Sequence, residues 1–322
     1  GFLQTCGWKL PLVVGWESMT QAFIGKAVTR SCNRLLINEG VSNVENLGYY
    51  NGKFGPLNEM SIPMNDRVHW FGDGVYDAGP ARNYKIFAID EHIDRFFNSA
   101  ELLEIEMPCT KQELKDLLNK LVKKVDTGSQ FVYYQVTRGT GIRDHAFTEG
   151  PGNLWVMLKP ATISDGIEPI KLITEPDTRF LHCNIKTLNL IPNCMAMQQA
   201  VEAGCDEVVF HRGDRVTEGA HSGLAILKDG VFCTPPADNL ILPSITRKHF
   251  LTLCDKLGVP TRIAPFTVDE LKNADEVMIL STGTHCVGAC ELDGKPLGGK
   301  DPALLDKLQK AYQQWFNEET AK

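Results

Sequence analysis

From Leu47 onward, the chain alternates β-rich runs, several of them paired through short turns, with capped amphipathic helices. The first pair is the clearest, because the Asn-Gly dipeptide at Asn51 and Gly52 separates two aromatic-rich flanks and is a strong β-hairpin signal. Paired strands with helices between them favour an α+β or mixed α/β fold over a doubly wound parallel sheet. The length of 322 residues suggests two domains.

The N-terminal half is expected to contain two helices and two strands after the hairpin. Residues 91–104 carry an apolar face at helical spacing. A second helix begins at a capping box formed by Thr110 and Glu113. Residues 131–138 and 154–158 are rich in Val, Tyr, Trp and Leu and are typical of strands.

Residues 159–166 have the composition of a linker, so a smaller α+β domain is expected over 47–160 and a larger α/β domain over 161–322. The second domain is expected to contain a strand at 170–174, a helix from Pro192 to Gly204, three strands separated by turns at 213–214 and 229–230, a helix at 246–258, a short helix capped by Thr267 and Glu270, and a last helix begun by Asp301 and Pro302.

Residues 1–46 are interpreted as an extension outside the native domain. Residues 1–43 show no clear periodicity, and the apolar stretch after Lys9 is too short for a secretory signal. Regular patterning begins only at Leu47. A translation start near Val44 or Glu45 is one interpretation of this change.

Composition argues against several classes of protein. The 33 basic and 40 acidic residues give a net charge of −7, which disfavours a nucleic-acid binder or a protein of anionic membrane surfaces. No apolar run approaches the roughly 18 residues of a membrane span. The ten scattered cysteines are expected to be reduced thiols in a cytoplasmic protein. Cys286, Cys290 and His285 lack the second ligand pair that zinc requires, so no metal is expected.

Two side chains could carry chemistry. Lys186 lies among apolar neighbours, where it is either a strand-edge lysine that reaches solvent or a desolvated amine able to form a Schiff base. Glu218 ends a β-rich run before Gly219, where it is either exposed on a hairpin or a buried acid that could hold a pyridinium nitrogen.

A phosphate site is also suggested, although each part of the signal is weak alone. Residues 242–247 lead directly into a helix, so the amides of Ile245 and Thr246 would face outward at its N-terminus. The small, hydroxyl-rich turn at Ser281–Thr284 follows an apolar run and could supply a second contact to the same anion.

Together these features resemble the fold-type IV pyridoxal-phosphate enzymes, and the subfamily of D-amino-acid transaminases most closely. The resemblance covers about residues 47–318. Its matching stretches are residues 71–77 (FGDGVYD), 91–95 (EHIDR), 135–140 (QVTRGT), 183–190 (CNIKTLNL), 216–219 (VTEG) and 245–247 (ITR). Several stretches in the correct order make the signal specific.

The resemblance implies pyridoxal 5′-phosphate as cofactor, held covalently by Lys186, which also moves the substrate proton. Glu218 is implied to pair with the ring nitrogen, and Leu242 to contact the ring. The remaining implied cofactor ligands, all for the phosphate, are Arg95, Ile245, Thr246 and Thr282. For Arg95, an ordinary surface salt bridge remains the alternative.

The substrate side of the resemblance is carried by Arg143 and His145, which match the Arg-x-His pattern of D-amino-acid transaminases. With Tyr76, they are implied to trap the substrate α-carboxylate, a task that suits a guanidinium. A homodimer is implied, since in the family this loop reaches a site near the subunit boundary. The alternative is an exposed polar loop.

Three positions depart from the family pattern. Gly223 stands where an asparagine is common, Ser244 where a glycine precedes Ile-Thr-Arg, and Gly283 where the turn usually has a threonine. These changes affect supports of the cofactor, so they bear on affinity and rate more than on the reaction class.

The resemblance therefore implies transamination between a D-amino acid, with D-alanine first, and a 2-oxo acid such as 2-oxoglutarate or pyruvate. The alternatives are a branched-chain L-amino-acid aminotransferase, an aminodeoxychorismate lyase, and a cofactor-binding protein with little activity.

Overall fold

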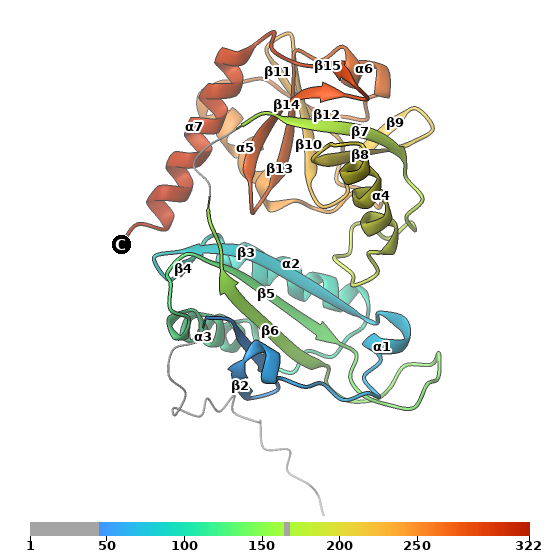
Figure 1. The fold of residues 1–322 in the computed structure, drawn as a ribbon, viewed down its shortest axis with the longest axis vertical. Helices are drawn as coiled ribbons and strands as arrows, with labels where there is room; N and C mark the ends of the chain where they lie inside the picture. The colour runs from blue at the N-terminus through green and yellow to red at the C-terminus, as the bar shows by residue number, and fades with distance from the viewer. Residues whose placement is uncertain (1–44, 164–167) are drawn as a thin grey trace, which may run out of the picture. The chain divides into compact units, whose positions relative to one another are not determined.

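The computed structural model describes residues 45–163 and 168–322, which form two β-sheets with helices packed on each (Figure 1). The predicted extension lies outside the described residues, apart from its last two positions. The α+β, mixed α/β class is confirmed, whereas the domain division near residue 160 stays a prediction. In the described part, no helix is both long enough and apolar enough to cross a membrane.

The first sheet has six strands, and every neighbouring pair is antiparallel. Its spatial order is β2-β1-β6-β5-β3-β4. Its strands and helices are β1 (Leu47–Tyr50), β2 (Lys53–Pro56), α1 (Val68–Phe71), β3 (Gly74–Arg82), β4 (Lys85–Ile86), α2 (Ile89–Leu102), α3 (Lys111–Leu121), β5 (Gln130–Thr137) and β6 (Asn153–Pro160), with 3-10 turns at Leu57–Glu59 and Val122–Lys124.

The core of this first unit lies between the sheet and helices α2 and α3. Alternate residues of β5 are buried, as a strand with one covered face requires. Tyr134 of β5 meets Phe96 of α2 edge to face at 4.9 Å. Four leucines of α3 complete the same core, so α2 is held firmly against β3 and β5.

The second sheet has nine strands and is mixed, because β7 pairs in parallel with both β8 and β14. Its order is β12-β11-β10-β13-β14-β7-β8-β9, with β15 on β14. Its elements are β7 (Ile170–Pro176), α4 (Ile191–Glu202), β8 (Glu207–Arg212), β9 (Arg215–Gly219), β10 (Gly223–Lys228), β11 (Val231–Thr234), α5 (Ile245–Leu257), β12 (Thr261–Ile263), α6 (Val268–Lys272), β13 (Glu276–Ser281), β14 (His285–Leu292), β15 (Lys295–Pro296) and α7 (Pro302–Glu319).

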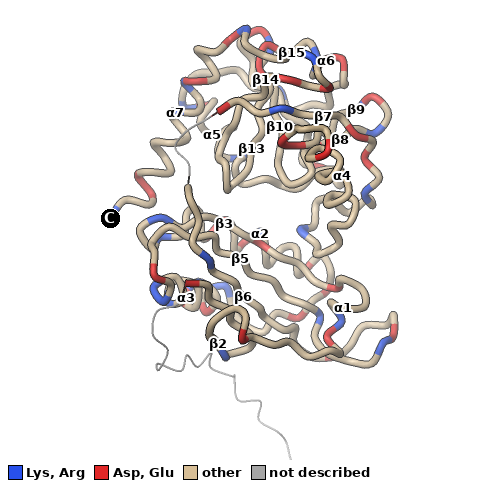
Figure 2. The backbone as a smooth tube through the Cα atoms, viewed as in Figure 1, with Lys and Arg blue, Asp and Glu red and all other residues tan. Residues whose placement is uncertain are grey.

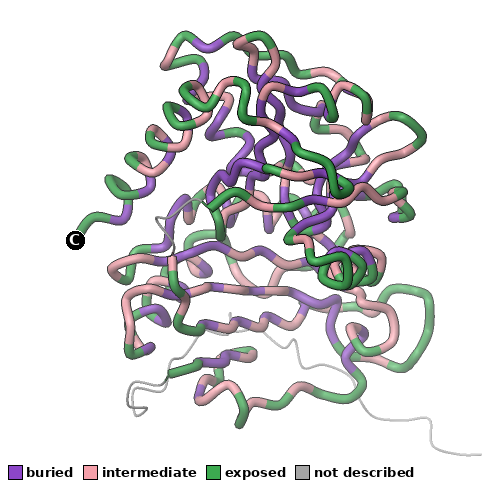
Figure 3. Tube along the Cα trace, turned by 45° about the horizontal axis from the view of Figure 1, so that its top comes forward, coloured by how far each residue is buried: buried purple, intermediate pink, exposed green. Residues whose placement is uncertain are grey.

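Short contacts join β3 of the first sheet to the segment that carries Lys186. The amide of Tyr76 on β3 donates to the carbonyl of Lys186 at 2.9 Å, and the amide of Leu188 donates to the carbonyl of Gly74 at 3.0 Å. Buried residues continue along both sheets (Figure 3). Acidic and basic residues are interspersed along the described chain (Figure 2). The lysine segment is therefore held against β3.

The predictions that depend on residues close together in the sequence are confirmed. Asn51 and Gly52 both have positive φ, 44° and 93°, as a type I′ hairpin turn requires. Thr110 and Thr267 each cap their helix in a complete capping box. Asp301 caps α7, with Pro302 in its first turn.

Two predictions about the second sheet need correction. Four strands, not three, lie between α4 and α5, because residues 220–222 interrupt the run between β9 and β10. Lys186 does not lie on a strand edge, since its segment makes only one isolated bridge, between Thr187 and Val75. Both segments matter because their residues line one cavity, which is described below.

Candidate active site

A cavity of about 390 Å³ collects predicted residues from distant parts of the chain. Six of the ten predicted site residues line it: Tyr76, Arg95, Lys186, Glu218, Leu242 and Thr282. Ile245 and Thr246 directly follow Ser244, which also lines it. Arg143 and His145 do not line this cavity. The structure thus brings the cofactor-side residues together and leaves the two substrate-side residues elsewhere.

Lys186 is held by its backbone and presents its amine to the cavity. Its amide donates to the hydroxyl of Ser99 at 3.2 Å, and its carbonyl accepts from Tyr76. The Nζ atom lies 4.4 Å from the centre of the Tyr76 ring. The amine therefore faces an aromatic wall inside the cavity, as a nucleophilic lysine would.

Glu218 is buried at the end of β9 and not exposed on a hairpin. One carboxylate oxygen accepts from Arg179 at 2.6 Å, and the other accepts from the amide of Leu242 at 3.0 Å. Burial raises the pKa of Glu218 to about 7, although Arg179 opposes this shift. An acid in this state can share a proton with a basic ring nitrogen.

Arg179 is a site residue that the sequence reasoning missed. It is buried and bonds Asp177 through two nitrogens, at 3.0 and 2.9 Å, in addition to Glu218. Its third acceptor is the carbonyl of Leu240 at 3.2 Å. In the sequence, this role is indicated only by an acid, Asp177, and a base, Arg179, two residues apart just after the strand expected at 170–174. Such pairs are also common on protein surfaces.

The opposite end of the cavity offers ligands for an anion. Arg95 reaches from α2 to the carbonyl of Pro243 at 3.3 Å, just before α5 begins. Ser244 caps α5 by accepting from the amide of Arg247 at 3.1 Å. The amides of Ile245 and Thr246, at the first helical positions, have no acceptor within the helix. This combination of guanidinium and helix N-terminus is suited to a phosphate.

Arg95 is positioned by a buried acid, so its surface salt-bridge alternative is wrong. Asp77 on β3 accepts from Nε and from a second nitrogen of Arg95, both at 2.8 Å. His92, one turn earlier on α2, bonds the same carboxylate at 2.7 Å. Burial opposes the charge on Asp77, but Arg95 and His92 outweigh it and lower the pKa of Asp77. Asp77 thus remains ionised and fixes the guanidinium.

The Thr282 turn forms the third side of the anion end. Ser281 and Thr284 share a hydroxyl–hydroxyl hydrogen bond of 2.7 Å, and the amide of Thr284 donates to the hydroxyl of Ser281 at 3.1 Å. Thr282 and Gly283 lie between them and line the cavity. This turn therefore presents small polar groups to the same cavity.

Gly223 and Ser244, two of the departures from the family pattern, are neighbours in space. A Cβ added at Gly223 would lie 3.4 Å from both Cβ and Oγ of Ser244. A side chain at 223 would therefore begin in van der Waals contact with Ser244. Gly283, the third departure, has open space around its Cα.

Arg143 and His145 lie on an exposed loop near Phe71. The guanidinium of Arg143 is 5.3 Å from the Phe71 ring centre, and the His145 ring is 5.2 Å from it. His145 lines a neighbouring cavity that shares Phe180 with the cavity of Lys186. In the single chain, this loop is therefore adjacent to the site but not part of it.

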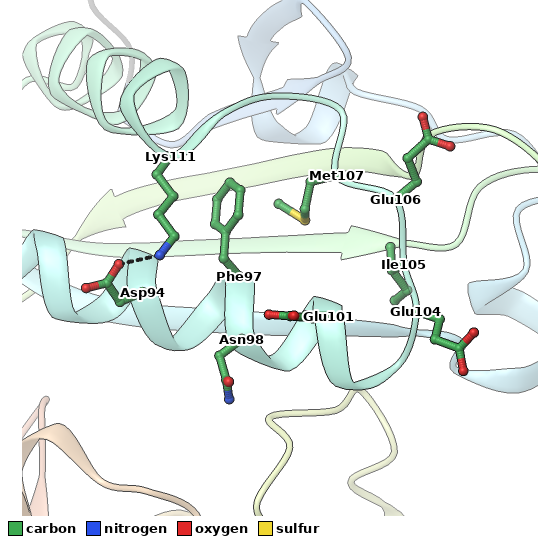
Figure 4. A pocket seen from close by; sticks show the side chains of 9 residues that line it. All are labelled: Asp94, Phe97, Asn98, Glu101, Glu104, Ile105, Glu106, Met107 and Lys111. Carbon is green, nitrogen blue, oxygen red and sulfur yellow. Dashed lines mark hydrogen bonds and ion pairs between the residues drawn. The ribbon is translucent and has the colours of Figure 1, made fainter.

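A further pocket lies over α2 and the loop that follows it (Figure 4). It shares no lining residue with the cavity of Lys186. Its charged residues are Asp94, Glu101, Glu104, Glu106 and Lys111, and Lys111 is paired with Asp94 at 2.7 Å. Such an acidic surface repels a phosphate, so we place no cofactor there.

The family model for class IV aminotransferases matches residues 74–292, which include both cavity ends. The chain belongs to the class IV aminotransferases. Its curated relatives include D-alanine aminotransferases. The Staphylococcus haemolyticus protein is 35% identical over 273 residues, covering 83% of this chain and 97% of the relative. The Listeria monocytogenes serotype 4b protein is 38% identical over 268 residues, covering 81% and 91%.

A solved structure shares the fold of this aminotransferase. The branched-chain aminotransferase of the thermophilic archaeon Thermoproteus uzoniensis, solved with norvaline, has a TM-score of 0.77 at 20% identity and covers 85% of this chain and 96% of the other. The fold-type IV prediction is confirmed by this likeness and by the family.

This class IV aminotransferase depends on pyridoxal phosphate, and the residues of the cavity fit that group. An amine, a buried acid and an anion site line one cavity of suitable size. Glu218 accepts from the amide of Leu242, which lies two residues before Ser244, the N-cap of α5. The ring nitrogen and the phosphate of the cofactor would therefore both find partners in this cavity.

Proposed function

We propose that this enzyme transfers the amino group of a D-amino acid, with D-alanine preferred, to a 2-oxo acid such as 2-oxoglutarate or pyruvate. The observation that carries the proposal is that Lys186, Glu218 and the α5 end line one cavity. The D preference is supported by the D-alanine aminotransferases at 35–38% identity. The branched-chain enzyme at 20% identity bears on the fold alone.

Bound pyridoxal phosphate supplies the electron sink for the pair released when the substrate Cα–H bond breaks. Lys186 would accept that proton at Nζ and hold it for its return. Glu218 would hold the positive ring nitrogen through one carboxylate, whose orientation is fixed by Arg179 and the Leu242 amide. Leu242 would offer the ring an apolar surface and limit access of water.

The anion end would hold the phosphate of the cofactor. Arg95 supplies charge, the amides of Ile245 and Thr246 supply donors, and Thr282 supplies a hydroxyl and an amide. Because Asp77 and Pro243 already position Arg95, this end is organised before the cofactor arrives.

The substrate side is proposed to be completed by a second copy of the chain. Arg143, His145 and Tyr76 would then bind the α-carboxylate, with the loop of one subunit reaching the cavity of its partner. Exposed apolar side chains on the loop, Ile142 at 82% and Phe147 at 59%, support a covering surface. Phe180 and Leu181, near the cavity mouth, are also exposed. A cytoplasmic location is part of the same proposal.

The test is a substrate comparison with purified enzyme. D-Alanine and 2-oxoglutarate should yield pyruvate and D-glutamate, which chiral chromatography resolves. The kcat/KM for D-alanine should be at least about tenfold above that for L-leucine. An L-amino acid would place its α-carboxylate on the other side and lose the bidentate contact with the guanidinium. Faster turnover of L-leucine, or pyruvate release from aminodeoxychorismate, would assign one of the alternatives. Cofactor binding without any amino-group transfer would favour the binding protein motivated by Gly223, Ser244 and Gly283.

A further inference from the structure

Arg67 is a buried arginine that contacts the loop carrying the proposed substrate ligands. It lies at the N-terminus of α1 and is 2% exposed. One of its guanidinium nitrogens donates to the carbonyl of Asp144 at 2.7 Å and to the carbonyl of Ala146 at 3.0 Å. These two carbonyls flank His145 in the chain. A single guanidinium therefore holds the backbone on both sides of one proposed carboxylate ligand.

The loop has little regular structure of its own. It runs over residues 138–152, between β5 and β6, and this described segment contains no helix or strand. Residues 142–147 at its centre are all exposed. Ordering a long irregular loop costs conformational entropy, so contacts from the surrounding fold decide whether it presents its side chains in one geometry.

Arg67 is itself fixed by the first unit. Its Nε atom donates to the carboxylate of Asp73, just before β3, at 2.8 Å. Arg138 donates to the same carboxylate at 2.9 Å and binds the carbonyls of Leu103 and Glu104, after α2, through its other nitrogens. Two buried guanidiniums thus share one acid. Because a buried cation needs hydrogen-bond acceptors, the loop carbonyls complete the set around Arg67.

Phe71 links Arg67 to the side chains of the loop. The amide of Phe71 donates to the carbonyl of Arg67 at 3.0 Å, so both residues belong to one helical turn. The guanidinium of Arg67 lies 4.9 Å from the centre of the Phe71 ring, and that of Arg143 lies 5.3 Å from it. The His145 ring lies 5.2 Å from the same ring. The loop backbone and its two proposed ligands therefore rest on one short element.

We propose that Arg67 is a positioning residue for substrate binding, which holds the loop backbone so that Arg143 and His145 meet the substrate α-carboxylate already oriented. The inference rests on the proposed function, in which this loop completes the substrate side of a partner's cavity. Bidentate binding depends on the angle of the guanidinium, and a small displacement of a positioned group is costly. Arg67 does not line the cavity of Lys186, so it acts through the loop.

The test begins with the kinetics of Arg67→Met holoenzyme. Its kcat/KM for D-alanine should fall by about tenfold, mainly through a higher KM, while its affinity for pyridoxal phosphate stays unchanged. Arg67→Lys should lose less, because an amine keeps the charge beside Asp73 but cannot reproduce the planar set of donors. Arg262→Met, which breaks a surface pair with Glu270, is the matched control and should keep the wild-type kcat/KM.

A double-mutant cycle separates positioning from general loss of structure. The loop variant Arg143→Met/His145→Gln lacks both proposed ligands, so positioning them no longer matters. Adding Arg67→Met to this variant should lower kcat/KM by no more than about a further twofold. If the tenfold loss persists in full in this background, Arg67 does not act through these ligands and the inference is overturned.

Amide hydrogen exchange keeps the test decisive if Arg67→Met folds poorly. In Arg67→Lys holoenzyme, exchange at residues 139–148 should be faster than in the wild type, with exchange in β3 unchanged. Wild-type kcat/KM together with wild-type exchange in the Arg67 variants would overturn the positioning role alone. Full activity of the loop variant would instead remove the loop from substrate binding, and the inference would fall together with that part of the proposed function.

Discussion

Arg179 donates a hydrogen bond of 2.6 Å to Glu218, so a guanidinium and a carboxylate are buried together at the end of β9. Arg179 also binds Asp177, which Arg212 contacts as well at 3.1 Å, so Glu218 shares its guanidinium partner with a second acid. Glu218 therefore receives only part of that positive charge, and burial dominates its proton affinity. The basic ring nitrogen of pyridoxal phosphate can supply a further positive partner for the Glu218 carboxylate.

The first prediction concerns stability against pH in the cofactor-free protein. The folded pKa of Glu218 is about 7 and its ordinary value is 4.5, so the folded state binds the proton more tightly. This contribution to the free energy of unfolding is full below pH 4.5 and is lost as the pH rises to about 7, a change of about 3 kcal/mol. Urea unfolding at several pH values should show this loss relative to Glu218→Gln, which does not titrate. Parallel curves for the two proteins would contradict it.

The second prediction concerns the contact between Gly223 and Ser244. Gly223→Asn should destabilise the fold by about 1 kcal/mol, because its Cβ would already be in contact with Ser244 at 3.4 Å at the wall of the cavity. Ser244→Gly should cost only a few tenths of a kcal/mol as a helix cap, and it should recover most of the loss in the double variant. A double-mutant cycle of unfolding free energies measures this coupling. Strictly additive effects would show that the two positions do not share space.

The third prediction concerns the phosphate. Arg95→Gln should weaken binding of pyridoxal phosphate by about 10- to 100-fold, because a charge-assisted hydrogen bond is lost. Binding of pyridoxal, which lacks the phosphate, should change much less, and this ratio separates the phosphate contact from general destabilisation of the Asp77 pair. Lys115→Gln is the control, because it removes only an exposed pair with Asp90. An unchanged ratio would place the phosphate elsewhere.

The fourth prediction concerns the exposed loop. Arg143→Met should lower kcat/KM for D-alanine by about 10- to 100-fold, since a carboxylate loses a bidentate partner. Affinity for the cofactor should stay unchanged, because Arg143 does not line the cavity. Arg262→Met, which breaks a surface pair with Glu270, is the control for loss of a positive charge. Full activity in Arg143→Met would remove this residue from substrate binding.

The sequence predicted those features that depend on few neighbouring residues. The Asn51–Gly52 turn and the Thr110 capping box were correct because their partners lie within three residues. Lys186 and Glu218 were identified through the resemblance, but their surroundings were not. The backbone of Lys186 is held by Ser99 and Tyr76, 87 and 110 residues away (186 − 99 and 186 − 76). Pairing across such separations leaves no local pattern.

The same reason explains the residue that was missed. Arg179 binds an acid 39 positions downstream, on β9. It is an ordinary polar residue until the second sheet forms. The break at 220–222 was not predicted as a turn, because it lacks the pairing of Gly and Asp that marks the turns at 213–214 and 229–230.

The most direct test of the account is a single turnover without 2-oxo acid. Holoenzyme is mixed separately with D-alanine and L-alanine, and the visible absorbance of the bound cofactor is followed by stopped flow. D-Alanine should abolish that absorbance rapidly and release one pyruvate per site, L-alanine should act far more slowly, and Lys186→Ala should give neither change. Rapid loss with L-alanine alone, or wild-type turnover by Lys186→Ala, would contradict the assignment of this site.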